Sequence, residues 1–180
     1  ILVLINYENM KFLRIIPIIF IFLGIPPYMN LSYAGSKNPN EYKVLSSTNK
    51  KLSISDVQDY LNNGDKLVKD GDFEKAKQTY DKARNLARQL AGFYRDLNGS
   101  FKGLDARIPL EMDKKGRKSI KIWAQSNARL VSLYKRKEQS EVAVPLLVEI
   151  IRLMSPNGPE GKEAYNNLLQ LGFVDTTYKG

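Results

Sequence analysis

The sequence predicts an all-α fold, and three observations support that prediction. From residue 53 onward, apolar residues recur in steps of three and four, which is the spacing of one helix face. No segment alternates between apolar and polar residues as a half-buried strand would. Apolar residues make up 43% and charged residues 26% of the 180 residues, enough for one domain with a core. Because the chain has no Cys, packing without disulfides must stabilise that core.

Five helices are expected in the segment 53–180, at about 53–69, 73–98, 109–137, 140–154 and 160–171. Ser55 and Gln58 fit a capping box at the first start. Gly99 suits a left-handed cap after the second helix. Pro109 suits the first position of the third helix, where its missing N–H is not needed. Gly172 is expected to close the last helix.

A secretory signal peptide is predicted at residues 10–34. Two basic residues, Lys11 and Arg14, precede an apolar run at 15–25, and small residues in 32–34 fit a cut before Gly35. With Met10 as the natural start, residues 1–9 are interpreted as upstream sequence translated from an incorrect start. The alternative is a retained membrane anchor, which the shortness of the apolar run and its prolines disfavour.

The mature chain is therefore expected outside the cytoplasm. The compartment would be a periplasm, or a thylakoid lumen if the host is photosynthetic. Residues 35–52 are polar and lack periodicity, so we expect a flexible linker before the helical domain at 53–180.

The amino-acid composition excludes several classes of catalytic and metal-binding site. With no His and no Cys, the chain cannot build a Ser–His triad, a zinc–thiolate site or a His-ligated haem. No cofactor or metal is expected, and catalysis by paired carboxylates is left as the enzyme alternative. The net charge of +9 favours an acidic protein or an anionic membrane surface as partner. Nucleic acid is not expected, because an exported protein meets little of it.

The first two expected helices resemble a tetratricopeptide repeat (TPR), a helical hairpin that recurs every ~34 residues. The family's small positions fall on Gly64 and Ala76, which would let the two helices approach closely. Its larger positions fall on Tyr60, Leu67 and Tyr80. The turn at 70–72 is typical of the family, and explains its two Asp residues better than a calcium loop, which needs more ligands.

A second, weaker match centres on Ala143, and the last helix resembles the family's capping helix. Residues 91–123 exceed what two adjoining repeats require. They form either an extended central helical arm or a degenerate middle repeat. Unbroken helical periodicity up to Leu97 favours the arm.

The resemblance implies a non-enzymatic protein-interaction module, such as a scaffold or assembly factor for an envelope or membrane complex. Its concave groove would hold a peptide and would be lined by Gln58, Leu61, Asp65, Val68, Lys69, Gln125, Ala128, Ser132, Lys135 and Arg136. The rival interpretation is a peripheral protein held on a membrane by its basic arm.

The basic arm is the second candidate site, formed by Lys114, Lys115, Arg117, Lys118 and Lys121. Arg84, Arg88 and Arg95 are candidates to extend its field. The alternative is an ordinary solvated surface. Trp123, the only Trp, is expected in the core, because it shares a helix face with Ile120 and Leu130.

Overall fold

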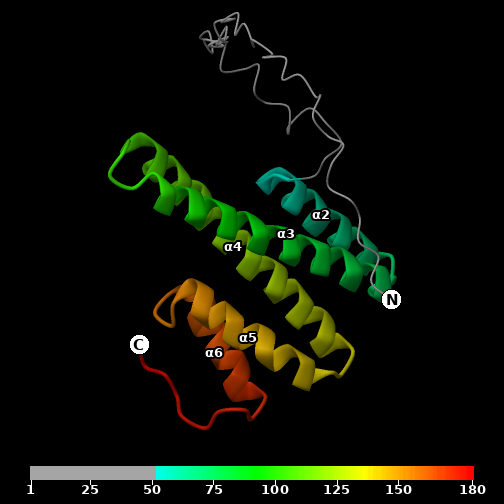
Figure 1. Cartoon of the computed structure of the whole chain (residues 1–180). Coiled ribbons are helices and arrows are strands. Elements are labelled where there is room, and N and C mark those ends of the chain that lie inside the picture. The colour runs from blue at the N-terminus through cyan, green and yellow to red at the C-terminus, as the bar shows by residue number, and fades with distance from the viewer. Residues whose placement is uncertain (1–51) are drawn as a thin grey trace, which may run out of the picture. The chain divides into compact units, whose positions relative to one another are not determined.

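The computed structural model describes residues 52–180, and this part of the chain is all-α, as predicted (Figure 1). Its helices are α2 (Ile54–Lys69), α3 (Phe73–Ser100), α4 (Arg107–Arg136), α5 (Ser140–Met154) and α6 (Pro159–Gln170). The predicted signal peptide and nearly all of the predicted linker lie outside the described residues. Within 52–180, no helix combines the length and the hydropathy that crossing a bilayer would require.

The N-cap of α2 differs from the predicted cap residue by two positions. The N-cap is Ser53, whose Oγ accepts a hydrogen bond from the backbone N of Asp56 at 3.2 Å. Ser53 has an extended backbone, with φ −141° and ψ 164°, as an N-cap requires. Ser55 already lies inside the helix, so the predicted Ser55–Gln58 box is wrong.

The turn between α3 and α4 also differs in detail. The left-handed glycine is Gly103, with φ 86°, whereas Gly99 is still helical. The next helix begins at Arg107, whose backbone N donates to the carboxylate of Asp105 at 3.0 Å. Pro109 is therefore the third residue of α4 rather than the first. Its missing N–H remains harmless there, because the first four N–H groups of a helix have no intrahelical acceptor.

The long helices α3 and α4 pack along each other and form the centre of the fold (Figure 1). Residues 91–123 belong to the continuous helices α3 and α4 and the turn between them. They therefore form an extension of this pair, as the arm alternative expects, and no separate middle hairpin. On the rest of the pair, α2 packs against α3 and more lightly against α4, α5 packs against α4, and α6 packs against α5.

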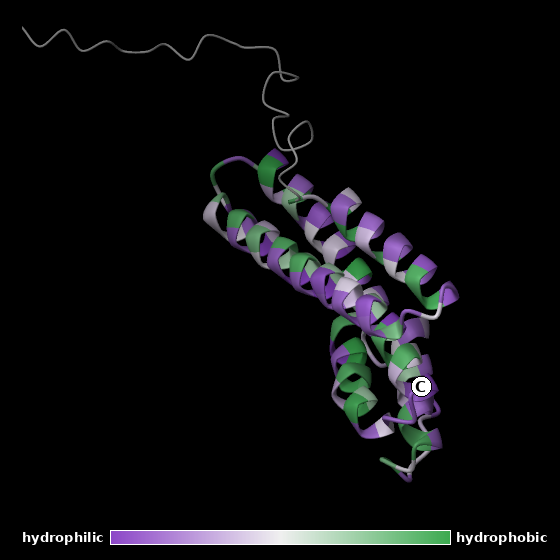
Figure 2. Ribbon diagram, turned by 90° about the vertical axis from the view of Figure 1, so that its right-hand side faces the viewer, coloured by the Kyte–Doolittle hydropathy of each residue, from purple (hydrophilic) through white to green (hydrophobic). Residues whose placement is uncertain are grey.

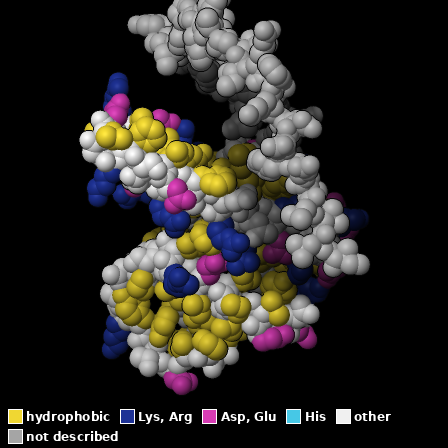
Figure 3. Space-filling model, in the orientation of Figure 1, with side chains coloured by type: hydrophobic (Ala, Val, Ile, Leu, Met, Phe, Trp, Pro, Cys, Tyr) yellow, Lys and Arg dark blue, Asp and Glu magenta, His cyan; other side chains and the backbone are white. Residues whose placement is uncertain are grey.

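The core runs through all five helices. Figure 2 shows hydrophobic and hydrophilic residues on different sides of the same helices, which is the amphipathic pattern that the sequence predicts. The fully or almost fully buried side chains include Val57, Leu61, Ala83, Leu90, Leu130, Leu133, Leu147 and Leu168. Trp123 is partly buried against this cluster, as expected. Large hydrophobic side chains also remain exposed, both on the free end of the α3–α4 pair and over α5 (Figure 3).

Gly64 lies at a close contact between α2 and α3. A Cβ atom on Gly64 would lie 2.3 Å from Cε1 of Tyr80, closer than any real contact allows. Ala76, one turn before Tyr80, is fully buried. Gly64 and the ring of Tyr80 therefore pack directly against each other, with the buried Ala76 one turn away on α3.

Candidate functional site: a groove along α4

Eight residues from the two predicted sites share one face of α4. Steps of three, four and one residue connect Lys114, Lys118, Lys121, Gln125, Ala128, Ser132, Lys135 and Arg136 along a single side of the helix. The sequence pattern assigned these residues to two separate sites, a basic arm and a concave groove. The helix joins three of the five arm residues and five of the ten groove residues into one stripe.

The five residues at the C-terminal end of this stripe line a hollow between α4, α5 and α6, with a volume of about 400 Å³. Its floor is small or apolar, from Ala124, Ala128, Val131, Leu147, Ile150 and Ala164. Gln125, Ser132, Lys135 and Arg136 form one rim, while Glu160, Glu163 and Asn167 of α6 form the other. An apolar floor between polar rims is the usual composition of a ligand-binding cleft.

A second hollow, of about 410 Å³, lies between α2 and the C-terminal end of α4. Here Asp65, Val68 and Lys69 face Ser132 and Arg136. The structure thus brings together residues from the two helices that the resemblance paired.

A third hollow, of about 730 Å³, lies toward the other end of α4 and is lined by Gln58 of α2 together with Lys115, Lys118, Lys121 and Gln125. Gln125 is shared with the first hollow, and Ser132 and Arg136 are shared by the first and second. We call this connected surface the α4 groove. Nine of the ten predicted groove residues line it.

The tenth, Leu61, was predicted wrongly as a groove residue. It is fully buried, in the same stripe as Val57 and Gly64, which packs into the core. The first-helix positions of the repeat pattern placed it on the concave surface, but here α2 turns that side chain inward.

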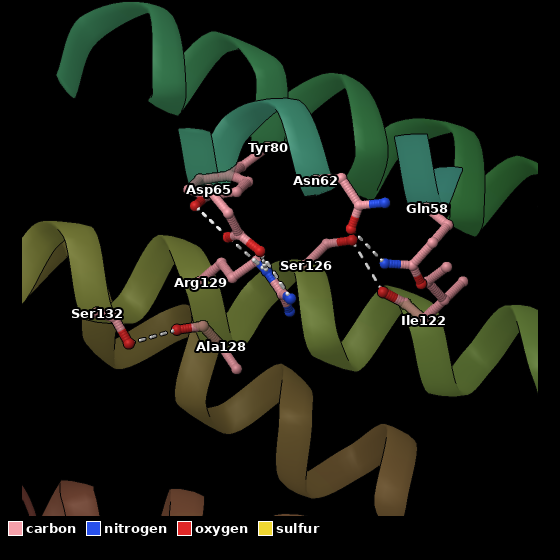
Figure 4. Close-up of polar contacts among 9 residues, drawn as sticks. All are labelled: Gln58, Asn62, Asp65, Tyr80, Ile122, Ser126, Ala128, Arg129 and Ser132. Carbon is pink, nitrogen blue, oxygen red and sulfur yellow. Dashed lines mark hydrogen bonds and ion pairs between the residues drawn. The ribbon is translucent and has the colours of Figure 1, made fainter. Parts of the chain in front are cut away.

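The groove is open because its central side chains are short and turned back onto their own helix. Ala128 carries only a methyl group, and the Oγ of Ser132 donates to the carbonyl oxygen of Ala128 at 3.0 Å (Figure 4). A hydroxyl that bonds its own backbone occupies little space outside the helix. The groove surface at these positions is therefore mostly helix backbone and small side chains.

An ion pair joins α2 to α4 at the second hollow. Nε and Nη2 of Arg129 donate to the carboxylate of Asp65 at 2.9 and 3.1 Å, and the hydroxyl of Tyr80 donates to Oδ1 at 2.6 Å (Figure 4). Burial alone would raise the pKa of Asp65, but the hydrogen bonds from Arg129 and Tyr80 and the charge of Arg129 together lower it. Burial, followed by the bond to Asp65, raises the pKa of Tyr80.

A second polar cluster lies beneath α5. The guanidinium of Arg84 donates to Oε2 of Glu149 at 2.8 Å, and Nδ2 of the fully buried Asn127 donates to the same atom at 2.8 Å. Burial opposes ionisation of Glu149, but these bonds and the Arg84 charge lower its pKa. The indole N–H of Trp123 acts in the same direction, although it lacks a hydrogen bond of normal geometry.

This second cluster corrects one expectation. Arg84 does not extend the basic surface, because its side chain is only 28% exposed and is committed to Glu149. Neither Glu149 nor Arg129 was among the predicted site residues. The only sequence signal for Arg129 is its place one turn from Gln125 and Ser132 on α4.

The five basic-arm residues differ in their ion pairing and in the surface that they line. Lys115 pairs with Glu111 at 2.5 Å and Arg117 with Asp113 at 2.9 Å, while Lys121 lies 3.9 Å from Glu160. Lys114 and Lys118 have no ion-pair partner among residues 52–180. Arg117 lies away from the groove and lines a separate hollow between α3 and α4 with Arg88 and Arg95.

The carboxylates of the two polar clusters are held in the ionised state. Asp65 and Glu149, which accept hydrogen bonds from Arg129 and Asn127 of α4, are each held ionised by a guanidinium, so neither is poised to carry a proton near neutral pH. Within residues 52–180, no group of three or more Asp or Glu side chains converges as a metal site would require. No protein-family model, curated protein or solved structure matches the chain.

Proposed function

We propose that this chain is a non-enzymatic protein-interaction module acting outside the cytoplasm, and that the α4 groove holds a segment of its partner. The observation that carries the proposal is the groove itself. Three hollows share residues along one helix face, and the hollow beside α6 has an apolar floor between polar rims. Such a groove fits a peptide or a helix whose apolar side chains enter the floor.

The charge of the groove favours an acidic partner segment. Seven basic and four acidic residues line the three hollows. Of these, Arg129 and Asp65 neutralise each other. Lys69, Lys118 and Arg136 have no ion-pair partner among the described residues, so their charges are available to a ligand. Complementary charge of this kind speeds encounter and sets orientation more than it adds affinity.

The resemblance to the TPR family supports the same proposal, because members of that family bind peptides on the surface formed by their first helices. In this chain, that surface would lie on α2 and α4. A scaffold or assembly factor for an envelope or membrane complex is the role that fits an exported module of this kind. Export is itself proposed, from the signal-peptide pattern in residues 10–34.

A displayed library of random peptides tests the proposal and requires no identified partner. Selection on the wild-type protein should enrich peptides that combine acidic with apolar residues. Their binding should be lost in Ala128→Trp, because an indole at this exposed position fills the hollow between α4 and α6. The matched control is Val142→Trp, on α5 and outside the groove, where the side chain is 38% exposed.

The control variant should bind the selected peptides as wild type does, and both variants should melt near the wild-type temperature. The proposal would be contradicted if no peptides are enriched. It would also be contradicted if the enriched peptides bind Ala128→Trp as tightly as wild type.

A further inference from the structure

The free end of the α3–α4 pair exposes large apolar side chains. We call residues 93–114 the hairpin tip. Leu104 is 78% and Leu110 is 73% exposed, and Phe93 and Leu97 are about half exposed. Among the hydrophobic residues from 92 to 121, only Met112 is buried. A two-helix extension has no third layer to cover these side chains, so they face solvent.

The tip also carries positive charge that its own acidic residues do not neutralise. All four acidic residues between 93 and 121 are ion-paired, in Arg95–Asp96, Arg107–Asp105, Lys115–Glu111 and Arg117–Asp113. Lys121 lies near Glu160 of α6. This leaves Lys102, Lys114 and Lys118 without an ion-pair partner among the described residues.

The tip extends beyond the packed part of the fold. The core cluster ends at Leu90 on α3 and at Ile122 on α4, with Tyr94 packed against its edge. Farther out, Asn98 Nδ2 donates to the carbonyl oxygen of Pro109 at 2.8 Å and ties the two helices together. Figure 1 shows this end of the pair free of α5 and α6, and Figure 3 shows hydrophobic and basic side chains side by side on it.

We propose that the hairpin tip docks into an anionic lipid surface. Leu104 and Leu110 enter the boundary between headgroups and acyl chains, while Lys102, Lys114 and Lys118 contact anionic headgroups. Each lysine near such a surface favours binding, and stable membrane attachment takes two signals, here apolar insertion and a basic patch. Lys118, one turn beyond the tip on α4, also lines the α4 groove. Lys102, Leu104, Leu110 and Lys114 line none of its hollows, so this inference does not depend on the groove.

A lipid surface fits this tip better than a protein does. Leu104 and Leu110 stand at and beside a turn and line none of the hollows of the α4 groove. A protein partner would need a matching cavity to receive them, whereas a bilayer accepts any protruding apolar group. The long aliphatic stems of the lysines can then lie along the apolar layer with their ammonium groups at the headgroups.

Vesicle sedimentation with the protein expressed from the whole chain tests the proposal. Wild type should bind phosphatidylcholine vesicles that contain phosphatidylglycerol, and should bind pure phosphatidylcholine far more weakly. Leu104→Ser/Leu110→Ser should weaken binding roughly tenfold or more, because the apolar area that enters the membrane is lost. Lys102→Gln/Lys114→Gln/Lys118→Gln should weaken it by about ten- to a hundredfold at low salt.

Two matched control variants carry the same kinds of substitution, apolar to Ser and Lys to Gln, at exposed positions outside the hairpin tip. Val148→Ser/Phe173→Ser removes exposed apolar side chains from the other end of the fold, and Lys66→Gln/Lys82→Gln/Lys162→Gln removes the same charge from exposed positions. Both controls should bind as wild type does. Residues 1–51 are common to all variants, so any binding through that segment is common to all of them as well.

Insertion itself can be measured, because the chain has no Cys. An environment-sensitive fluorophore on Leu104→Cys should brighten and shift to the blue with anionic vesicles, and lipid-borne quenchers in the acyl region should quench it. The same label on Phe173→Cys should not respond. The proposal is overturned if wild type does not bind, if the tip variants bind like their controls, or if the label at 104 stays in water on bound protein.

Discussion

Nε of Arg129 lies 2.9 Å from Oδ1 of Asp65, and this ion pair fastens α4 to α2 at one edge of the α4 groove. The hydroxyl of Tyr80 donates to the same carboxylate oxygen, so α3 joins the contact. One carboxylate thereby fixes the relative position of three helices. Because the groove is formed between α2, α4 and α6, its shape depends on such contacts.

We expect stability to fall in acid. The pKa values of Asp65 and Glu149 are lowered in the folded protein from ordinary values of 3.8 and 4.5. Near those values the unfolded chain binds more protons than the folded protein. The contribution of these two groups to the free energy of unfolding is therefore complete above their ordinary pKa values, and it is lost as pH falls through the lowered, folded-state values. Thermal melts over a pH series should show this decline.

The variant Asp65→Asn/Glu149→Gln isolates these two groups. It should melt lower than wild type at neutral pH, because both guanidiniums lose their counter-charges, and its melting temperature should depend less on pH below about 5. An acid dependence as steep as that of wild type would show that other carboxylates cause the decline.

Gly64→Ala should destabilise the fold. Its Cβ would lie 2.3 Å from Cε1 of Tyr80, so the ring must move and its hydrogen bond to Asp65 is strained or lost. We expect a cost of ~1–3 kcal/mol in denaturant unfolding, the usual range for overpacking. Gly64→Leu, which is larger, should cost at least as much.

Gly92→Ala is the matched control. Gly92 is also within a helix, and a Cβ there would meet nothing within 4 Å. Replacing an open helical glycine by Ala should stabilise the protein by up to ~1 kcal/mol. If the two variants changed stability in the same direction, the close contact of Gly64 with Tyr80 would not govern the packing of α2 on α3.

The unpaired cations of the groove should govern how fast an acidic peptide binds. Lys69→Gln/Lys118→Gln should slow association with a selected acidic peptide and weaken its dependence on salt, because steering by exposed charge is screened over ~8–10 Å. Lys82→Gln/Lys162→Gln makes the same change of net charge outside the groove. Stopped-flow association rates at several salt concentrations should separate the two variants, and identical rates would argue against steering by the groove.

Loss of the Asn98 side chain should loosen the hairpin tip without unfolding the protein. Its amide bridges α3 and α4 where few apolar residues are buried. In Asn98→Ala, backbone amides near residues 96–112 should exchange hydrogen faster, while those around Leu130 in the core should be unchanged. Hydrogen exchange read by mass spectrometry measures both regions in one experiment, and unchanged exchange at the tip would show that this bond does not hold it.

The helices could be predicted from sequence because each carries a regular apolar stripe with clear breaks. Residues 140–154 were predicted without error, since a turn precedes them and the proline–glycine segment at 155–159 follows. The cap errors at Ser55 and Gly99 have a common cause. Several nearby residues can perform either role, and the backbone conformation of the whole turn decides between them.

The site could be predicted only in part, for a similar physical reason. A single helix face can be read from spacing, so nine groove residues lie where α2 and α4 meet solvent. Which side of α2 turns inward depends on its packing against the other helices. For this reason Leu61, which packs inward, was wrongly predicted to line the groove. The partners of Arg129–Asp65 and Arg84–Glu149 are 64 and 65 residues apart, so no local pattern reveals them.

The most direct test of the α4 groove as the binding surface is position-specific photocrosslinking in the living host. A photoreactive amino acid at Ser132, an exposed groove residue, should capture one discrete partner, and the same amino acid at Val142 should not. Adding Ala128→Trp to the Ser132 probe should abolish that adduct while leaving protein levels unchanged. No adduct at Ser132, or an adduct that persists with the groove filled, would contradict the proposal that this groove holds the partner.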